Sequence, residues 1–359
     1  MRGTLVVEDG TTAEGVVFGA SKRVTGELVF NTNMTGYTEA LTDPSYRGQI
    51  LMMTYPLIGN YGVDPAAMES KEVQVTGFVV KEACPTPVHP KAAMGVDRFL
   101  DGQGRPGLSG VDTRMLTIKT RTRGTMRAAL VPEGGDVETA MREVRTMPFP
   151  DARNLVAEVS TREAVEWPGP AGRTFVVIDC GVKMNIVREM QRSGRVVQLP
   201  YDATPDDIAR HEPSGVIISN GPGDPAHPEI LATAVKTAKE IASEVPILGI
   251  CLGHQVLALA FGGRTYKLKF GHRGGNQPVK DLRTGRVHIT SQNHGFAVDA
   301  KSMEASGFDV THVNLNDQTV EGMVHKALPL LSVQYHPEAH PGPWDNEYIF
   351  REFVDMAGR

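Results

Sequence analysis

The stretch ILGICLGHQVLALA, residues 247–260, decides the fold of the second half of the chain. It begins with an apolar segment, Ile247–Ile250, that predicts a buried strand, and it continues from Val256 with apolar residues at helical spacing. Between the two segments stands Cys251, with Gly249 and Gly253 two residues away on either side. A buried strand that turns at once into a helix is typical of α/β folds with a parallel sheet.

The same alternation of apolar strands and helices surrounds this stretch. Strands are predicted over Thr174–Ile178, Val196–Leu199 and Gly215–Ile218, and helices over Lys183–Gln191 and Pro228–Ser243. We therefore expect residues 173–359 to form an α/β domain whose mostly parallel sheet is flanked by helices. Ligands of such sheets bind at the carboxyl ends of the strands, which is where Cys251 falls.

Residues 1–167 have a different pattern and predict a β-rich α+β domain. Short β-branched runs such as Leu5–Val7 and Val16–Phe18 predict strands, and helices are expected after Asp112 and over Asp136–Arg145. The segment at 168–172, PGPAG, disfavours both helix and strand and predicts a linker. Two domains also suit a chain of 359 residues, at roughly 150 residues per domain.

Composition excludes several classes of protein. With 40% apolar and 22% charged residues the chain is not a disordered protein. Its 37 basic and 42 acidic side chains leave a net charge of −5, so nucleic acid and membrane surfaces are not expected partners. One basic cluster is interpreted as a solvated or interface face, because no aromatic residues interleave it. This cluster consists of Arg114, Lys119, Arg121, Arg123 and Arg127.

The three cysteines also bear on the class of protein. Cys84, Cys180 and Cys251 lie far apart in sequence, so neither a disulfide framework nor a CxxC zinc or redox site can be read from their spacing. We find no secretion signal at the amino terminus and no apolar stretch long enough for a membrane span. A cytoplasmic location is therefore expected.

Cys251 is the candidate nucleophile. A cysteine between glycines, directly after a buried strand and at the start of a helix, matches the strained turn called a nucleophile elbow. At this point the helix amino terminus favours a thiolate, and the exposed apex admits a substrate carbonyl. The alternative is a buried structural cysteine in an ordinary turn.

A thiolate nucleophile needs a histidine, and that histidine needs an orienting group. The segment Leu330–Tyr335 predicts a strand that is followed by His336 and Glu338, whose spacing in extended chain places both side chains on one side. His254 is the local rival, but its side chain is expected to point along the helix and no acidic residue follows it.

Two glycine-containing loops complete the candidate site. Asn220–Pro225, NGPGDP, follows the strand at Gly215–Ile218, and its glycines allow backbone N–H groups to approach an oxyanion. The Leu252 amide, just after the nucleophile, is the expected second donor. Asn293–Phe296 forms a further polar loop after a strand over Val287–Thr290. Either segment alone also fits a simple turn.

The motifs GICLGHQ, NGPGDP and YHPE, in this order and spacing, resemble those of the class I glutamine amidotransferase family over residues 173–359. The resemblance implies that Cys251 attacks the glutamine side-chain carbonyl, His336 transfers protons and Glu338 orients His336. It implies oxyanion donors at Gly223 and Leu252. It assigns glutamine binding to Gly221, Gly223, Leu252, Gln255, Asn293, Gly295 and Phe296.

The first half resembles the small subunits of carbamoyl-phosphate synthetase. The resemblance is carried by Phe30–Gly62 and by VDTR at Val111–Arg114, together with KFGHRGGNQPV and QNHGFAV in the second half. In that family the serine of TDPSY, here Ser45, reaches the glutamine site from the first domain. The stretch Lys81–Gly107 and the linker match less clearly.

The resemblance implies a glutaminase that supplies ammonia to a separate large subunit, which makes carbamoyl phosphate from bicarbonate and ATP for arginine or pyrimidine biosynthesis. No metal or organic cofactor is expected in this chain, and ATP and magnesium belong to the large subunit. A heterodimer is expected, with L-glutamine as substrate. The absence of a G-x-x-x-x-G-K-[ST] loop agrees with this division but is weak evidence.

Three alternatives stay open from the residues alone. They are a glutaminase that serves another synthetase, a catalytically silent protein that retains the fold, and a cysteine protease. The segment Phe30–Gly62 disfavours the first, and the intact set of Cys251, His336 and Glu338 disfavours the second. Comparing free glutamine with a peptide as substrate tests the third.

Overall fold

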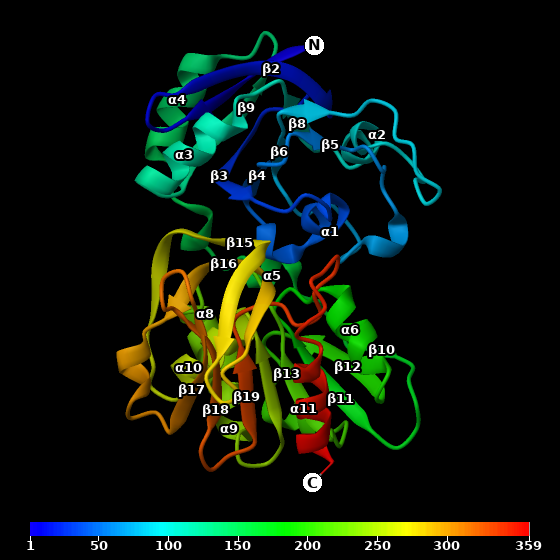
Figure 1. Cartoon of the computed structure of the whole chain (residues 1–359), viewed down its shortest axis with the longest axis vertical. Coiled ribbons are helices and arrows are strands. Elements are labelled where there is room, and N and C mark those ends of the chain that lie inside the picture. Colours follow the sequence, from blue (N-terminus) through cyan, green and yellow to red (C-terminus); the bar gives the residue numbers. More distant parts are fainter. Residues whose placement is uncertain (359) are drawn as a thin grey trace. The chain divides into compact units, whose positions relative to one another are not determined.

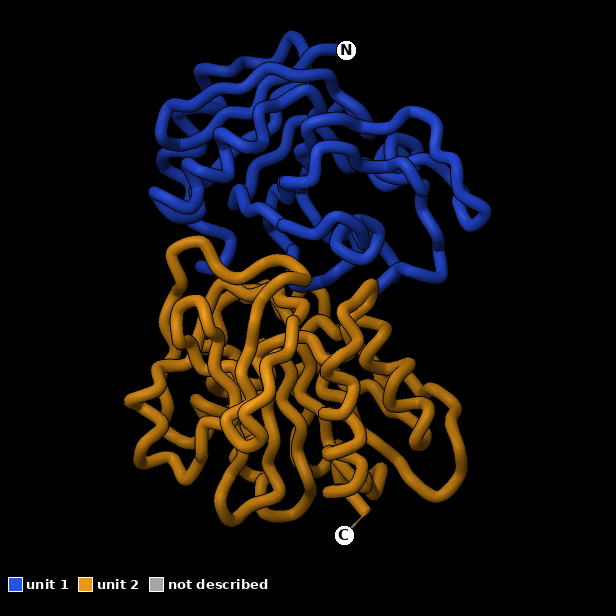
Figure 2. Tube along the Cα trace, in the orientation of Figure 1, with its two compact units in different colours: residues 1–152 blue, residues 153–359 orange. Residues whose placement is uncertain are grey.

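The structure, a computed structural model, describes residues 1–358. Its contacts divide the chain into two compact units, Met1–Ala152 and Arg153–Arg359 (Figure 2). The predicted linker at 168–172 therefore lies inside the second unit. The reason is that Val165–Trp167 forms strand β10, which pairs with β12 (Arg195–Pro200) in the sheet of that unit. Proline and glycine density alone did not reveal this pairing.

Strands of the first unit close into a barrel, in the order β1-β2-β8-β6-β4-β3-β9 (Figure 1). They are β1 (Arg2–Val7), β2 (Thr12–Gly19), β3 (Val24–Asn31), β4 (Gln49–Met53), β6 (Gly77–Val79), β8 (Pro106–Ser109) and β9 (Met126–Pro132). The pairs β3–β4, β4–β6 and β6–β8 are parallel, and the pairs β1–β2, β2–β8, β3–β9 and β1–β9 are antiparallel. The β-rich character predicted for this region is present.

Helices and short strands surround the barrel. They are α1 (Tyr37–Thr42), η1 (Pro44–Tyr46), β5 (Leu57–Ile58), η2 (Pro65–Ala67), β7 (Glu82–Ala83), α2 (Val96–Asp101), α3 (Thr113–Arg123), α4 (Val137–Thr146) and η3 (Pro150–Ala152). The Asp112 carboxylate accepts from the Met115 N–H at the start of α3, and the Asp136 carboxylate accepts from the Thr139 N–H at the start of α4. Both predicted helix starts are confirmed, because aspartate satisfies an N–H that the helix leaves unpaired.

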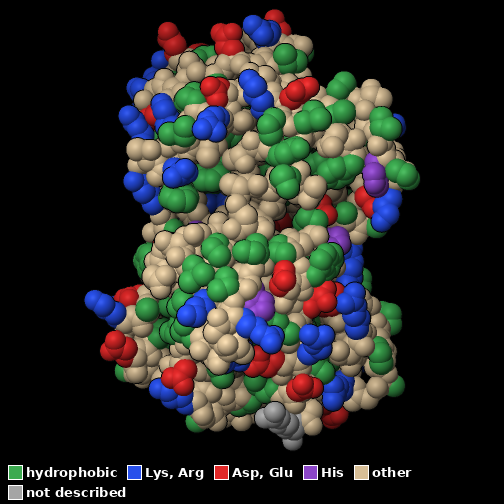
Figure 3. Space-filling view, in the orientation of Figure 1, with side chains coloured by type: hydrophobic (Ala, Val, Ile, Leu, Met, Phe, Trp, Pro, Cys, Tyr) green, Lys and Arg blue, Asp and Glu red, His purple; other side chains and the backbone are tan. Residues whose placement is uncertain are grey.

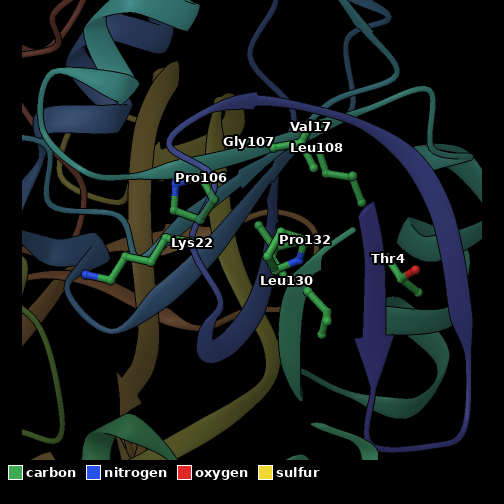
Figure 4. Close-up of a pocket in the computed structure, with 9 residues that line it drawn as sticks. Thr4, Val17, Lys22, Pro106, Gly107, Leu108, Leu130 and Pro132 are labelled. Carbon is green, nitrogen blue, oxygen red and sulfur yellow. The ribbon is translucent and has the colours of Figure 1, made fainter. Parts of the chain in front are cut away.

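The basic cluster is partly paired within its own unit. Lys119 and Arg123 form ion pairs with Asp9 at 3.0 and 3.4 Å, and Arg127 pairs with Glu8 at 2.5 Å. Positive side chains gather over the region of α3 and α4 (Figure 3). A small, mainly apolar pocket lies elsewhere in the barrel (Figure 4). Its lining consists of Thr4, Val17, Lys22, Pro106, Gly107, Leu108, Leu130, Val131 and Pro132.

The second unit is built on one ten-stranded sheet in the order β10-β12-β11-β13-β14-β19-β18-β17-β15-β16. The strands not yet given are β11 (Thr174–Asp179), β13 (Gly215–Ile218), β14 (Ile247–Ile250), β15 (Thr265–Asp281), β16 (Val287–Val298), β17 (Phe308–Asn314), β18 (Val320–His325) and β19 (Leu330–Val333). In this sheet the neighbouring strands β12, β11, β13, β14 and β19 are parallel to one another, as predicted. Strand β10 pairs antiparallel with β12, and beyond β19 the strands β18, β17, β15 and β16 each pair antiparallel with their neighbours. The sheet is thus mixed, and the prediction of a mostly parallel sheet holds only for its centre.

Helices cover both faces of the parallel centre (Figure 1). They are α5 (Val156–Val159), α6 (Met184–Gln191), α7 (Pro205–Ala209), α8 (Pro228–Ile230), α9 (Lys236–Ile241), α10 (Leu252–Ala260) and α11 (Tyr348–Ala357), with a π-helical turn η4 (Leu231–Val235) and a 3-10 helix η5 (Ala300–Met303). Among residues 1–358, none of the helices combines the length and apolar character that crossing a bilayer requires.

The alternation of side chains along β11 explains the two layers. Val176 and Ile178 belong to one buried cluster, with apolar residues of α8, α9 and α10, whereas Phe175 and Val177 belong to another, with residues of α6 and α11. Successive side chains of a strand point to opposite faces, so a continuous apolar strand must be covered on both sides. This packing fixes the carboxyl ends of β13, β14 and β19, from which the candidate site is built.

Candidate active site

Cys251 occupies a strained turn between β14 and α10. Its φ of 54° and ψ of −102° lie in a region that side-chain-bearing residues rarely adopt. Its N–H donates to the Val333 carbonyl at 2.9 Å, which ties the turn to β19. The strand-to-helix turn predicted from the sequence is therefore present, with the cysteine at its apex.

The glycines around Cys251 are required by close backbone approach. A Cβ on Gly253 would lie 2.0 Å from the Ile218 carbonyl oxygen, and a Cβ on Gly249 would lie 2.6 Å from the Gly253 carbonyl oxygen. On the neighbouring loop, a Cβ on Gly221 would lie 2.1 Å from the Cys180 carbonyl oxygen. Glycine lets helix α10 and the loop after β13 pack directly on the sheet.

His336 and Glu338 follow the end of β19 and are both buried. The His336 N–H donates to the Ser291 carbonyl at 2.9 Å, and its ring Nδ1 lies 2.6 Å from Glu338 Oε1. The other ring nitrogen, Nε2, is buried without a hydrogen-bond partner in the described part of the chain. The Cys251 thiol is close enough to contribute to the pKa of His336. Cysteine, histidine and glutamate thus meet in one place.

The charges of this group are strongly coupled. Burial alone would lower the pKa of His336, but the Glu338 carboxylate outweighs it, with a smaller contribution from Cys251, so that the pKa is raised well above its usual value. Burial alone would raise the pKa of Glu338, but Lys183 and His336 outweigh it and lower the pKa well below its usual value. The structure therefore favours an ionised glutamate that stabilises a protonated imidazole.

The two backbone amides predicted to bind an oxyanion belong to Leu252 and Gly223. Leu252 is the first residue of α10, and Gly223 adopts a φ of 90° in the loop after β13. Among residues 1–358 neither amide has a hydrogen-bond acceptor. A Cβ on Gly221 would lie 2.9 Å from Leu252 Cδ2, so the loop and the start of α10 are adjacent. The oxyanion role stays a prediction that this arrangement supports.

The residues predicted to bind glutamine in the second unit lie close to the turn. Cys251 Sγ is 3.7 Å from the Asn293 carbonyl oxygen, and Gln255 Nε2 donates to the Phe296 carbonyl at 2.8 Å. Asn293, Gly295 and Phe296 were expected in a loop, but β16 continues through them to Val298. Pairing with β15 persists on both sides of a register shift, which explains the longer strand.

Ser45 lies in the first unit, in the 3-10 helix η1. Its backbone N–H donates to the Asp43 carboxylate at 2.9 Å. Its contribution to glutamine binding stays a prediction.

The surroundings of His254 disfavour a role as a base. It is fully buried on α10, and its Nδ1 lies 2.9 Å from the Ser332 hydroxyl. Burial, with a smaller contribution from His312, lowers the pKa of His254 to about 3. An imidazole with so low a pKa is a weak base at neutral pH, which agrees with its dismissal in favour of His336.

Sequence reasoning missed two polar residues at the start of α6. Lys183 Nζ lies 3.0 Å from Glu338 Oε1, and Asn185 Nδ2 donates to the Glu338 backbone carbonyl at 2.8 Å. Both residues are buried. The available signal was their position after the apolar strand β11, at the same edge of the sheet as Cys251.

A second cluster of buried polar side chains supports strand β16, which carries Asn293. His272, His294 and Glu321 approach closely enough to hold a metal ion. Most of their polar atoms are already engaged, however: His272 Nε2 lies 2.9 Å from Asp317, and His294 Nε2 lies 2.9 Å from Gln292 Oε1. His272 Nδ1 lies 3.6 Å from Glu321 Oε1 and has no hydrogen-bond partner in the described part of the chain. Gln292 Nε2 in turn donates to Glu321 at 3.0 Å. We interpret the group as a hydrogen-bond network that fixes β15 and β16.

Comparison with known proteins covers both units. The profile described as glutamine amidotransferase class-I matches residues 176–356, and the profile described as carbamoyl-phosphate synthase small chain, CPSase domain, matches residues 5–130. Proteins named carbamoyl phosphate synthase small chain from Archaeoglobus fulgidus and Methanopyrus kandleri are each 52% identical, over 99% of this chain and 99% of their own. The protein of that name from Bacillus caldolyticus is 49% identical, over 99% of this chain and 96% of its own.

Proposed function

The chain belongs to the carbamoyl phosphate synthase small chain family, and we propose that it hydrolyses glutamine with Cys251, His336 and Glu338 as its catalytic triad. The family membership makes this the chain that supplies ammonia to a large synthase subunit. The observation that carries the residue assignment is the 2.6 Å contact between His336 Nδ1 and Glu338, because it leaves Nε2 to serve the thiol of Cys251.

Acylation begins with attack of the Cys251 sulfur on the side-chain carbonyl carbon of glutamine. The carbonyl oxygen becomes an oxyanion, which the Leu252 and Gly223 amides stabilise. When the intermediate collapses, the carbon–nitrogen bond breaks and His336 gives its Nε2 proton to the departing nitrogen. Ammonia leaves, and a γ-glutamyl thioester remains on Cys251.

Deacylation reverses the proton transfer. His336, now neutral, takes a proton from a water molecule that attacks the thioester carbonyl, and a second oxyanion forms at the same two amides. The carbon–sulfur bond then breaks, which releases glutamate and restores the thiolate. Throughout both steps Glu338 keeps the imidazole oriented and stabilises its charged form.

Substrate binding is proposed for the residues around the turn. The set comprises Gly221, Gly223, Leu252, Gln255, Asn293, Gly295 and Phe296, with Ser45 contributed by the first unit. Glutamine carries an ammonium and a carboxylate besides its amide, so it needs several polar partners. The proximity of Asn293 to Cys251 and the bond from Gln255 to Phe296 support this assignment within the second unit.

The partner of this chain is proposed to be the large subunit, in a heterodimer located in the cytoplasm. The reactions that use ATP, magnesium and bicarbonate are assigned to that subunit, and the carbamoyl phosphate would serve arginine or pyrimidine synthesis. The triad chemistry itself uses only side chains and backbone amides of this chain. A glutaminase for another synthetase is disfavoured because residues 5–130 match the carbamoyl-phosphate synthase profile.

The test is Cys251→Ser in the full chain, assembled with its large subunit. We expect glutamine-dependent synthesis of carbamoyl phosphate to be lost and ammonia-dependent synthesis to continue, because only the supply of ammonia passes through the thioester. Cys84→Ser is the matched control, since Cys84 lies in the first unit and its thiol donates to the Thr86 carbonyl. Glutamate release retained by Cys251→Ser would place the nucleophile elsewhere.

A further inference from the structure

A buried lysine completes the charge balance of the triad. Lys183 precedes the first residue of α6, and its side chain is 6% exposed. Its ammonium lies 3.0 Å from Glu338 Oε1 and 3.4 Å from the Ala339 carbonyl oxygen. Because buried lysines are rare unless they are paired, this placement needs an explanation beyond packing.

The contact is made to one particular oxygen. Glu338 Oε1 lies near both the Lys183 ammonium and His336 Nδ1, so the lysine and the histidine share a single acceptor atom. A carboxylate held from two directions has little freedom to rotate. The orientation of the imidazole therefore depends on Lys183 as well as on Glu338.

The backbone around this contact is anchored from the same helix. Asn185 Nδ2 donates to the Glu338 backbone carbonyl at 2.8 Å, and the Lys183 N–H donates to Asn220 Oδ1 at 3.0 Å. Asn220 begins the loop that carries Gly223. The start of α6 thus connects the segment with the catalytic glutamate to the loop with the predicted oxyanion donor.

We propose that Lys183 is a positioning residue of the triad, which keeps Glu338 ionised and oriented while it limits how firmly His336 holds its proton. This inference rests on the proposed function of Cys251, His336 and Glu338. With the cysteine as thiolate and the histidine protonated, the four groups sum to zero charge. Without the lysine the group would carry one unbalanced negative charge in a buried site.

The electrostatics of the site agree with the two opposing effects. After burial, which acts to raise it, Lys183 is the largest influence on the pKa of Glu338 and lowers it. After burial and Glu338, Lys183 is also the next influence on the pKa of His336, which it lowers. His336 must give its proton to departing ammonia, and a nearby cation makes that release easier.

Other titratable groups also face this pair. Cys251 contributes to the pKa of His336, and the charge of His336 is felt in turn by His294. Glu189 on α6 is influenced by Glu338 and by His340. Lys183 and His336 each form a direct ion pair with the Glu338 carboxylate, at 3.0 and 2.6 Å.

The test is Lys183→Met in the full chain assembled with its large subunit. Methionine keeps much of the apolar stem and removes the charge. Because a cation within about 4–6 Å shifts a pKa by roughly one unit or more, we expect the alkaline limb of kcat/KM against pH, on which His336 loses the proton that it must donate, to move up by about one pH unit. We expect kcat to fall more than KM rises.

Two further variants keep the inference testable if Lys183→Met is unstable. Lys183→Arg retains the charge and should keep the alkaline limb within about half a pH unit of the wild type. In a Glu338→Gln background there is no carboxylate to hold, so adding Lys183→Met should change kcat by less than about threefold. Lys119→Met, which removes a lysine paired with Asp9 in the first unit, is the matched control and should leave the profile unchanged.

The outcomes separate this inference from the proposed function. If the wild-type complex does not hydrolyse glutamine, the proposed function itself is wrong. If the wild type is active and Lys183→Met has the same pH profile, or loses equal activity with and without the Glu338 carboxylate, the lysine has only a structural role and the inference is overturned.

Discussion

Replacing Gly253 by alanine tests whether close backbone packing positions the nucleophile. The added Cβ would lie 2.0 Å from the Ile218 carbonyl oxygen and 2.7 Å from the Ile218 carbonyl carbon. Both atoms belong to the central strand β13, which cannot move without disturbing its parallel neighbours β11 and β14. Helix α10 must therefore retreat from the sheet by about 1 Å to restore normal contact distances.

The cost can be estimated from this displacement. Overpacking a buried site typically destabilises a protein by about 1–3 kcal/mol, and each kcal/mol lowers the Tm of a domain of this size by about 2–4 °C, so we expect a loss of about 2–12 °C. The same movement carries Cys251 and Leu252 away from His336. Because a misplacement of about 1 Å can cost 10²-fold in rate, glutamine hydrolysis should fall by about that factor.

The measurements are thermal unfolding by circular dichroism and glutamate release at saturating glutamine. Gly95→Ala is the control, because Gly95 has a φ of −78° and a Cβ there would meet only Pro87 at 3.7 Å. This control should differ little from the wild type in both assays. A Gly253→Ala chain with wild-type Tm and wild-type activity would refute the reasoning, since it would show that α10 can accept the methyl group without moving the nucleophile.

Four further substitutions test the assignment of the base, its orienting glutamate and the contribution of the first unit. His336→Asn should lower kcat for glutamine hydrolysis by about 10³-fold or more, whereas Glu338→Gln should cost less because the proton carrier remains; a His254→Asn variant that folds and is equally inactive would contradict the assignment of the base. Ser45→Ala should raise the KM for glutamine from a few-fold to about tenfold, because a neutral hydroxyl contact is worth about 0.5–1.5 kcal/mol. An unchanged KM would place Ser45 outside the glutamine site.

Local sequence patterns predicted the features that depend on neighbouring residues. The turn at Cys251 followed from a buried strand, two glycines and an apolar helix within one short stretch. The capping roles of Asp112 and Asp136 followed from residue type and the apolar positions after them. The contact between His336 and Glu338 followed from their spacing at the end of a strand. In each case the physical cause lies within a few residues.

The features that sequence reasoning missed depend on pairing across longer distances. Strands β18, β17, β15 and β16 are antiparallel because hairpin-like connections reverse the direction of the chain between them. The sequence of an apolar strand at the centre of a sheet does not indicate which strands are added at the edge of that sheet. Strand β10 precedes the predicted linker, yet it pairs with β12 and so belongs to the second unit. Register and partner choice were not encoded in the composition of either segment.

Lys183 shows how the prediction of a buried carboxylate can be extended to a prediction of the cation that pairs with it. Once Glu338 is predicted to be an ionised group at the edge of a parallel sheet, the cost of burying it requires a cation nearby. Parallel strands end at the same edge, so the cation should follow another strand of that sheet. Lys183 comes shortly after β11 and satisfies this condition, although 155 positions separate it from Glu338. The need for charge balance thus selects a partner that motif spacing cannot, and it does so from the same sequence.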